Sequence, residues 1–411
     1  FLLARDRRAV GDRVQTVRIF VITTVPEEGI NSASALAAGL ALTVISMAAF
    51  LVMPLYVGAA AEAQGLDQQQ VGILAALVAA GSAVSSIVVM QLVRRLPWRL
   101  TGAFTLSLML VSMTLSILVE NTTLFLALQA CAALGGGATY SLALTALADR
   151  HHSDRSFGLS VAAQVSFQVV GMLTLPYLVS RAGIDGILSL FIAMEIVGLL
   201  MLLWLPRQGR ALTATSHTTP LSFAPVLLAL GGCFFFFFNV GAVWAYIERM
   251  AVLSGFNAGQ IGNSLAVGVA VGVPGALLAS WCGDRFGRLG PLFIGTLGTV
   301  VAVYLLAQEM TLTAYVLAAA LYNFVWNFSL PFQYSAVNAV DASGRGVAAA
   351  PAFHGAGGAV GPGLAAMYVT ETNLSSVSWL AGGGVVISLV LFALALSMTA
   401  SRAVKGTDSD G

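Results

Sequence analysis

Polar and aromatic side chains recur at helical spacing within one apolar stretch in the second half of this chain. The stripe consists of Tyr322, Asn323, Trp326, Asn327, Gln333 and Tyr334. Amides hydrogen-bond polar solutes, and the rings of Tyr and Trp stack on flat ones, so the stripe could bind a small molecule. The amides could instead join neighbouring helices, because in an apolar medium they need a protein, water or ligand partner. We predict that the stripe as a whole lines a cavity.

Two titratable residues lie inside other apolar stretches. His354 carries an imidazole, which titrates near neutral pH, and Glu195 carries a carboxyl group that is costly to bury in its ionised form. Both are candidates for proton coupling. Alternatively, His354 bridges two helices and Glu195 is a protonated hydrogen-bond partner of a neighbouring helix. Asp149 and Glu248 stand at the ends of predicted helices, where we expect them to be solvated.

Membrane-spanning helices must position these residues. The chain is 58% apolar and 9% charged, and its single lysine is Lys405. Crossing the hydrocarbon core takes about 20 helical residues, and only helices or closed barrels satisfy their backbone groups in lipid. The predicted spans are 35–60, 71–93, 100–119, 123–148, 157–180, 184–206, 224–247, 260–282, 290–308, 312–337, 347–370 and 376–399. The sequence predicts an all-α polytopic membrane protein with twelve transmembrane helices.

A polar linker divides six of these spans from the other six. The predicted units are a cytoplasmic N-terminal tail (1–34), an N-terminal six-helix bundle (35–206), a cytoplasmic linker (207–222), a C-terminal six-helix bundle (223–400) and a cytoplasmic C-terminal tail (401–411). All of the 19 Lys and Arg residues except Arg181 and Arg249 fall on one side of the membrane in this topology. Positively charged loops stay in the cytoplasm, so both termini are expected there.

The two predicted bundles repeat one another at an offset of 190 residues. Residues 65–72 (GLDQQQVG) align with residues 255–262 (GFNAGQIG), and Arg95 and Arg155 align with Arg285 and Arg345. The offset also pairs Gln164 with His354. Six is an even number of spans, so the two copies have the same orientation, and we predict two pseudo-symmetric six-helix bundles.

The loop between the eighth and ninth spans carries a signature. Residues 281–288 read WCGDRFGR, and the pattern Asp-Arg-x-Gly-Arg at this place resembles the loop motif of the major facilitator superfamily of secondary transporters. The resemblance covers about residues 35–400 and implies two bundles around one central substrate site that is exposed alternately to each side. It assigns gating to Asp284, Arg285, Gly287 and Arg288. The alternative is that Arg285 and Arg288 only anchor the loop at the anionic membrane surface.

The first-half copy of this loop departs from the pattern. Residues 94–98 read RRLPW and lack both the acidic residue and the glycine. In the family the acidic residue helps to latch the halves together on the cytoplasmic side. We therefore expect any such latch in this chain to use the second-half copy.

The resemblance also implies that spans one, four, seven and ten face the substrate. With span five, they offer these further candidate binding residues: Tyr56, Gln129, Tyr140, Gln164, Gln168, Asn239 and Trp244. No Lys or Arg lies in the middle of the four cavity spans, and a multivalent anion would need such a counter-charge. We therefore predict a neutral or amphipathic solute.

The sequence predicts a secondary active transporter that works by alternating access and is proton-coupled. Its expected partners are a small-molecule substrate, protons and the lipid bilayer. We expect a monomer in the inner (plasma) membrane of a bacterium, with no cofactor, metal or nucleic acid. A drug/proton antiport exporter remains open, as does a transport-inactive sensor of the same fold. An integral membrane enzyme would need clustered catalytic groups, for which the adjacent His151 and His152 are the one suggestive pair.

Overall fold

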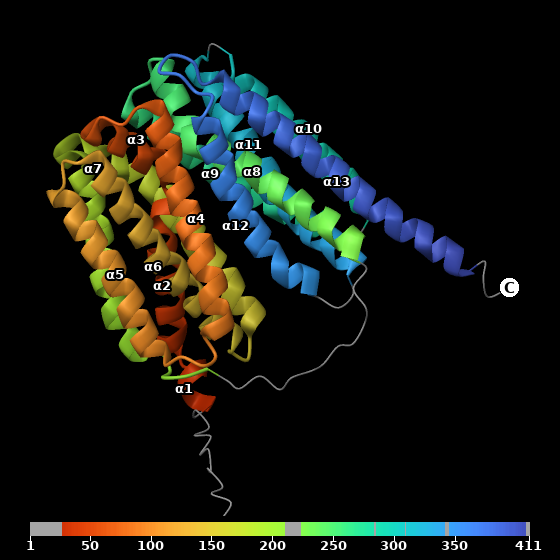
Figure 1. Cartoon of the computed structure of the whole chain (residues 1–411), viewed down its shortest axis with the longest axis horizontal. Coiled ribbons are helices and arrows are strands. Elements are labelled where there is room, and N and C mark those ends of the chain that lie inside the picture. Colours follow the sequence, from red (N-terminus) through yellow and green to blue (C-terminus); the bar gives the residue numbers. More distant parts are fainter. Residues whose placement is uncertain (1–26, 210–222, 283–284, 309, 342–344, 408–411) are drawn as a thin grey trace, which may run out of the picture.

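The computed structural model describes residues 27–209, 223–282, 285–308, 310–341 and 345–407, and its regular elements are helices. The helices of the first half are α1 (Glu27–Asn31), α2 (Ala33–Leu51), α3 (Met53–Gln64), α4 (Gln68–Leu92), α5 (Trp98–Leu118), α6 (Thr122–Ala148) and α7 (Ser153–Met201). Those of the second half are α8 (Phe223–Leu253), α9 (Ala258–Cys282), α10 (Leu289–Leu306), α11 (Leu312–Val340), α12 (Arg345–Ala366) and α13 (Ser375–Thr407). Figure 1 shows two bundles side by side.

Nine of the described helices are long and apolar enough to cross a membrane. One of them, α7, contains 49 residues and breaks at Gly183, where the backbone adopts φ 56° and ψ −145°. A continuous helix of that length would measure about 70 Å, more than twice the hydrocarbon thickness of about 30 Å, so α7 supplies two crossings. The long helices α11 and α12 are less apolar and complete twelve crossings. The predicted fold of twelve spans in two bundles is confirmed.

The first crossing consists of two helices that meet at Val52. Pro54 lies at the start of α3 and has no backbone N–H, so the carbonyl of Phe50 loses its usual helical bond. The indole Nε1 of Trp244 on α8 donates to this carbonyl over 3.1 Å. The break in the first crossing therefore creates an acceptor that the other bundle uses.

The repeated segment builds the same connection in both halves. Gly65 and Gly255 adopt left-handed φ values of 61° and 83°, which a glycine adopts without strain. Asp67 then caps α4 by accepting from the N–H of Gln70 over 2.7 Å, while the Gln70 side chain accepts from the N–H of Asp67. The side chains of Asn257 and Gln260 form the same reciprocal pair before α9. The sequence match therefore marks a helix stop followed by a helix start.

The bundles touch most extensively along two helix pairs, α4 with α12 and α7 with α9, and α8 also contacts α3 and α4. A Cβ added at Gly72 on α4 would lie 2.7 Å from the carbonyl oxygen of Pro362, and one at Gly262 on α9 would lie 2.5 Å from that of Met172. The offset of 190 that relates Gly72 to Gly262 also relates Met172 to Pro362. These two junctions, which we call the Gly72 junction and the Gly262 junction, are therefore copies of one contact.

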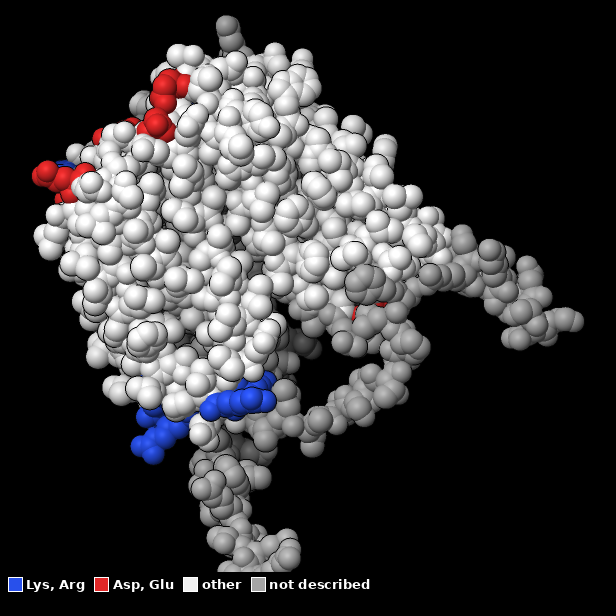
Figure 2. Space-filling model, in the orientation of Figure 1, with Lys and Arg blue, Asp and Glu red and all other residues white. Residues whose placement is uncertain are grey.

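The two ends of the molecule differ in charge. One end carries Arg94, Arg95, Arg150 and Arg155, and we call it the basic end; the other carries Glu62, Asp67 and Glu371, and we call it the acidic end. Figure 2 shows this separation on the N-terminal bundle. In Figure 1 the bundles meet at the end near α3 and part toward the end near α1. The space-filling view of Figure 2 shows a continuous surface between the bundles at the acidic end and a hollow between them toward the basic end, so the molecule is closed at the first and open at the second.

Candidate functional site

The N-terminal bundle presents a hydrogen-bonded group to the space between the bundles. Gln164 on α7 donates through Nε2 to the hydroxyl of Ser160 over 3.1 Å, and Ser160 donates to the hydroxyl of Thr43 on α2 over 3.0 Å. Tyr140 on α6 lies beside Gln164. Tyr140 and Gln164 are only partly buried, so a solute can reach them.

The C-terminal bundle presents His354 of α12 in the corresponding place. Its Nε2 lies 3.3 Å from Oε1 of Gln333, and its Nδ1 lies 3.5 Å from the hydroxyl of Tyr334. Because an amide oxygen can only accept, we assign the ring proton to Nε2, which leaves Nδ1 to accept from Tyr334. The ring of Phe237 on α8 stacks on the imidazole at 4.1 Å and 25°. Phe237 and Tyr334 are partly buried, whereas His354 is 5% exposed.

These two groups face each other across the bundle interface. Tyr140 of the N-terminal bundle lies near Tyr334 of the C-terminal bundle. Gln164 and His354 occupy positions related by the 190-residue offset, and each meets a tyrosine of its own bundle. We call Tyr140, Gln164, Gln333, Tyr334 and His354 the central polar cluster. Phe237 was not among the residues that the sequence predicted, because a run of five phenylalanines gives no sign of which one faces inward.

An aromatic row continues from this cluster toward the acidic end. Trp326 packs edge-on against Phe237 at 6.2 Å and against Trp244 at 6.1 Å. Trp244 reaches the other bundle through its bond to Phe50. Tyr322 lies behind the row, with its hydroxyl 3.3 Å from Oδ1 of Asn239. Trp326, like Phe237, is partly buried and is therefore placed to meet a solute, whereas Trp244 and Tyr322 are buried.

Other predicted binding residues lie inside one bundle. Asn323 and Asn327 donate to carbonyl groups of their own helix, those of Ala319 and Asn323. A Cβ at Gly272 on α9 would lie 2.6 Å from Nδ2 of Asn327, so this amide packs between α11 and α9. Gln168 is 9% exposed on α7. The structure does not bring these three side chains to the central polar cluster.

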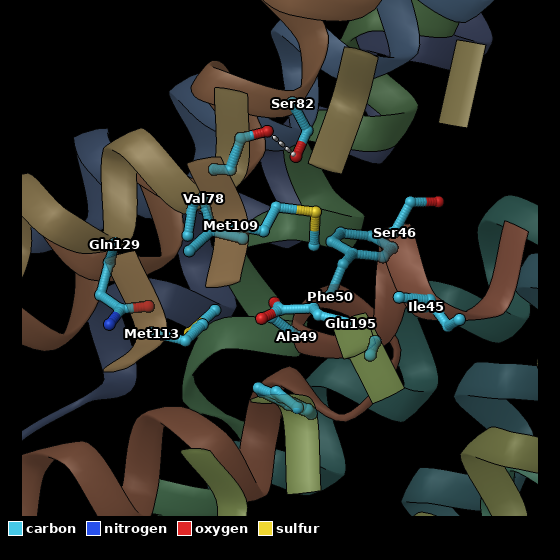
Figure 3. Close-up of a pocket in the computed structure, with 14 residues that line it drawn as sticks. Ile45, Ser46, Ala49, Phe50, Val78, Ser82, Met109, Met113, Gln129 and Glu195 are labelled. Carbon is cyan, nitrogen blue, oxygen red and sulfur yellow. Dashed lines mark hydrogen bonds between the residues drawn. The ribbon is translucent and has the colours of Figure 1, made fainter. Parts of the chain in front are cut away.

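Tyr56 and Gln129 also point into the N-terminal bundle. The Tyr56 hydroxyl donates to Oε1 of Gln129 over 2.5 Å, and Nε2 of Gln129 donates to the hydroxyl of Ser116 over 2.8 Å. Both residues are at most 1% exposed. Gln129 lines a cavity of the bundle together with Glu195, whose two carboxylate oxygens have no hydrogen-bond partner among the described residues. Figure 3 shows these side chains around the cavity.

A buried ionic group closes the acidic end. Arg249 on α8 donates through Nε and Nη2 to both carboxylate oxygens of Glu248, over 2.5 and 2.8 Å, and Nη2 also lies 3.4 Å from Glu62 on α3. Gly58 of α3 lies against the Glu248 carboxylate, where a Cβ would come within 2.5 Å. The expectation that Glu248 is solvated was wrong: it is 6% exposed, because Arg249 neutralises it beneath the other bundle.

The basic end of the N-terminal bundle is also tied by charge. Asp149 was expected to be solvated, but it is 7% exposed and lies 2.7 Å from Arg94, so that expectation was wrong as well. Arg150 donates to backbone carbonyls of Ile30, Asn31 and Ser32 at the start of α2. Burial lowers the pKa of Arg150, whose ordinary value is high enough that the guanidinium remains charged. His151 and His152 are exposed.

The predicted gating residues lie at the basic end of the C-terminal bundle. Asp284 falls outside the described residues. Arg285 lies over the ring of Trp281 at 5.2 Å, and Arg288 donates to the hydroxyl of Ser335 on α11 over 3.0 Å. Gly287 adopts φ 65° directly before α10. The offset relates Asp284 to Arg94, so the two halves carry opposite charges at this position.

Comparison with known proteins identifies the family. The chain matches the Major Facilitator Superfamily over residues 38–349 and belongs to that superfamily of transporters. No protein of curated function matches it in sequence.

Similar solved structures share the fold. A variant of the nucleoside transporter NupG is 15% identical, with a TM-score of 0.67, over 87% of this chain and 99% of the other. A bacterial homologue of the human lysosomal transporter Spinster, in an inward-facing and occupied conformation, is 14% identical, with a TM-score of 0.66, over 90% and 96%. A proton-dependent oligopeptide transporter is 12% identical, with a TM-score of 0.68, over 89% and 98%.

Proposed function

We propose that this protein is a secondary active transporter that carries a small neutral or amphipathic solute by alternating access. The observation that carries the proposal is the central polar cluster. It joins partly buried groups of both bundles, and it lies between an end that is closed by packing and an end where the bundles part. A solute held by both halves can be exposed to either side when the halves rock about the two junctions.

The charge of the two ends supports an orientation. Positively charged loops resist translocation, so the basic end and both termini belong in the cytoplasm, and we place the protein in the inner membrane of a bacterium. The conformation is then open inward, which is also the state of the similar Spinster homologue in its inward-facing structure. The carrier is proposed to act as a monomer, because both groups of the cluster come from one chain.

The chemistry of the cluster supports the solute class. It offers two phenol hydroxyls, two amides and one imidazole, with Phe237 and Trp326 beside them. None of these carries a fixed positive charge, so nothing in the cluster neutralises a phosphate or a dicarboxylate. A flat solute with hydrogen-bonding edges fits both features, and a nucleoside is a suitable probe because NupG has this fold.

Proton coupling is the proposed source of energy. His354 contacts two members of the cluster and carries a titratable imidazole, and Glu195 is the second candidate. Because His354 lies in the C-terminal bundle and Glu195 in the N-terminal one, the contribution of each to proton coupling can be tested by substituting it alone.

Counterflow in proteoliposomes tests the proposal. Liposomes are loaded with unlabelled solute from a panel of nucleosides, sugars and aromatic amines, and uptake of the labelled solute is followed. Gln164→Ala and His354→Ala should each lower exchange about five- to thirtyfold, because each removes a partner worth about 1–2 kcal/mol. The matched control is Gln91→Ala, which changes an exposed glutamine of α4. Exchange at the wild-type rate in both cluster variants would contradict the assignment of the site.

A further inference from the structure

The N-terminal bundle encloses a cavity that is separate from the central polar cluster. Fourteen residues from α2, α4, α5, α6 and α7 line it (Figure 3). Its water-sized space is about 20 Å³, which is room for one water molecule or one small ion. None of its lining residues belongs to the central polar cluster.

The residues that line the cavity offer hydrogen-bond acceptors and few donors. The hydroxyl of Ser46 donates to the carbonyl of Leu42 over 2.6 Å, and that of Ser82 donates to the carbonyl of Ala133 over 3.3 Å. Gln129 receives the Tyr56 hydroxyl at Oε1, and that oxygen keeps a second lone pair. The thioethers of Met109 and Met113 donate nothing. The hydroxyl hydrogens of Ser46 and Ser82 are therefore used within the bundle, and neither they nor the thioethers supply a hydrogen to the cavity.

Glu195 adds a carboxyl group to this wall of acceptors. It is 1% exposed, both of its oxygens lack a partner among the described residues, and it is the one charged residue of the fourteen that line the cavity. Since the bundle is surrounded by lipid, a bare carboxylate here would be strongly unfavourable. The cavity must therefore contain a species that brings a hydrogen or a positive charge.

The geometry points to a binding site for one small monovalent cation, the coupling ion, in this cavity. The ion is a proton on Glu195 with a water molecule beside it, or a sodium ion held by Glu195 and the neighbouring oxygens. The inference rests on the proposed function, because it names where a secondary transporter of this build holds its ion.

The cavity also has a physical link to the bundle interface. Ala49 and Phe50 of α2 line it, and the carbonyl of Phe50 is the group that accepts from Trp244 of the other bundle. The joint between α2 and α3 lies at Val52, two residues after Phe50. An ion that draws Glu195 and α2 together changes the position of the Phe50 carbonyl, and with it the contact between the halves.

Infrared difference spectroscopy on the purified full chain tests the proton form without any transport. Exchange into D₂O shifts the carbonyl stretch of a buried protonated carboxylic acid. We expect this band in the wild type, its loss in Glu195→Gln and its retention in Glu120→Gln, which changes an exposed glutamate. Should Glu195→Gln fail to fold, Glu195→Asp is expected to move the band rather than remove it.

Thermal unfolding in sodium chloride against choline chloride, at equal ionic strength, tests the sodium form. A sodium-specific rise in Tm that disappears in Glu195→Gln supports the site with sodium as its ion. The infrared carbonyl band without a sodium effect on Tm supports the site with a proton as its ion. The absence of both signals from the wild type, or a band that survives Glu195→Gln with no sodium effect, would overturn the inference. Either signal in a protein that exchanges no solute would instead remove the proposed function and leave the cavity site in place.

Discussion

The Gly72 and Gly262 junctions have the same backbone contact and different side chains around it. At the Gly72 junction, the hydroxyl of Tyr246 donates to the carbonyl of Gln68 over 2.8 Å, and the N–H of Gln68 donates to Glu371 over 3.1 Å. The offset relates Glu371 to Arg181, which lies over Tyr177 of its own helix at 5.0 Å instead of reaching the other bundle. Duplication therefore preserved how closely the halves approach, while divergence made one junction the more strongly bonded.

The largest effect on closure is expected where the two junctions are alike. Gly72→Ala and Gly262→Ala each push a methyl group against a backbone carbonyl that cannot rotate away, and each should disfavour closure by about 1–3 kcal/mol. The measurement is labelling of Ala59→Cys, at a residue of α3 that is 6% exposed in this conformation, by a membrane-impermeant maleimide in a background without the three native cysteines. Gly290→Ala is the control, because a Cβ there meets nothing within 4 Å. A junction that accepts alanine with unchanged labelling would show that the two contacts are not equivalent.

A second effect concerns the ionic group beside the Gly72 junction. Arg249→Met leaves the Glu248 carboxylate buried without its partner and should destabilise the protein by about 3–5 kcal/mol, measured by thermal unfolding in detergent. Adding Glu248→Gln to this variant should restore most of the loss, because no unpaired charge then remains. Glu62→Gln is the mild comparison, since that side chain is 64% exposed. Equal losses for Glu62→Gln and Arg249→Met would refute the assignment of Arg249 as the buried centre of the group.

The smallest effect should separate the two junctions. Tyr246→Phe removes one hydrogen bond between the halves and should shift closure by about 0.5–1.5 kcal/mol toward opening of the acidic end. Tyr177→Phe, at the Gly262 junction, removes an exposed hydroxyl and should leave maleimide labelling unchanged. If the two variants increase labelling equally, the asymmetry does not lie in these bonds.

Much of the frame was predictable from local sequence. The apolar stretches located the crossings, and the match between residues 65–72 and 255–262 located a connection whose caps are the same in both halves. The offset even pairs Gln164 with His354, which the structure places on opposite sides of the interface. Helical periodicity and helix caps depend on residues that are close together in the sequence. They can therefore be recognised without knowing which helices pack against each other in the fold.

The partners of the buried polar groups could not be predicted in the same way. Asn323 and Asn327 recur at the spacing of a cavity stripe, but amides that pack against a glycine of the next helix show the same spacing. Arg249 and Glu62 are separated by 187 residues, and nothing in either segment indicates the other. Glu248 looked like a solvated helix end because its cover, Gly58, belongs to the opposite bundle.

Pro54 has a consequence for how the halves can separate. While they are together, the indole of Trp244 satisfies the backbone oxygen that the ring leaves exposed at Phe50. Any rearrangement that pulls the tryptophan away must let a water molecule reach that oxygen, or leave it bare in an apolar surrounding. Separation at this point therefore requires water to reach the Phe50 carbonyl oxygen. A variant that keeps water out of this region should stay closed, because that oxygen would otherwise lose its hydrogen-bond partner.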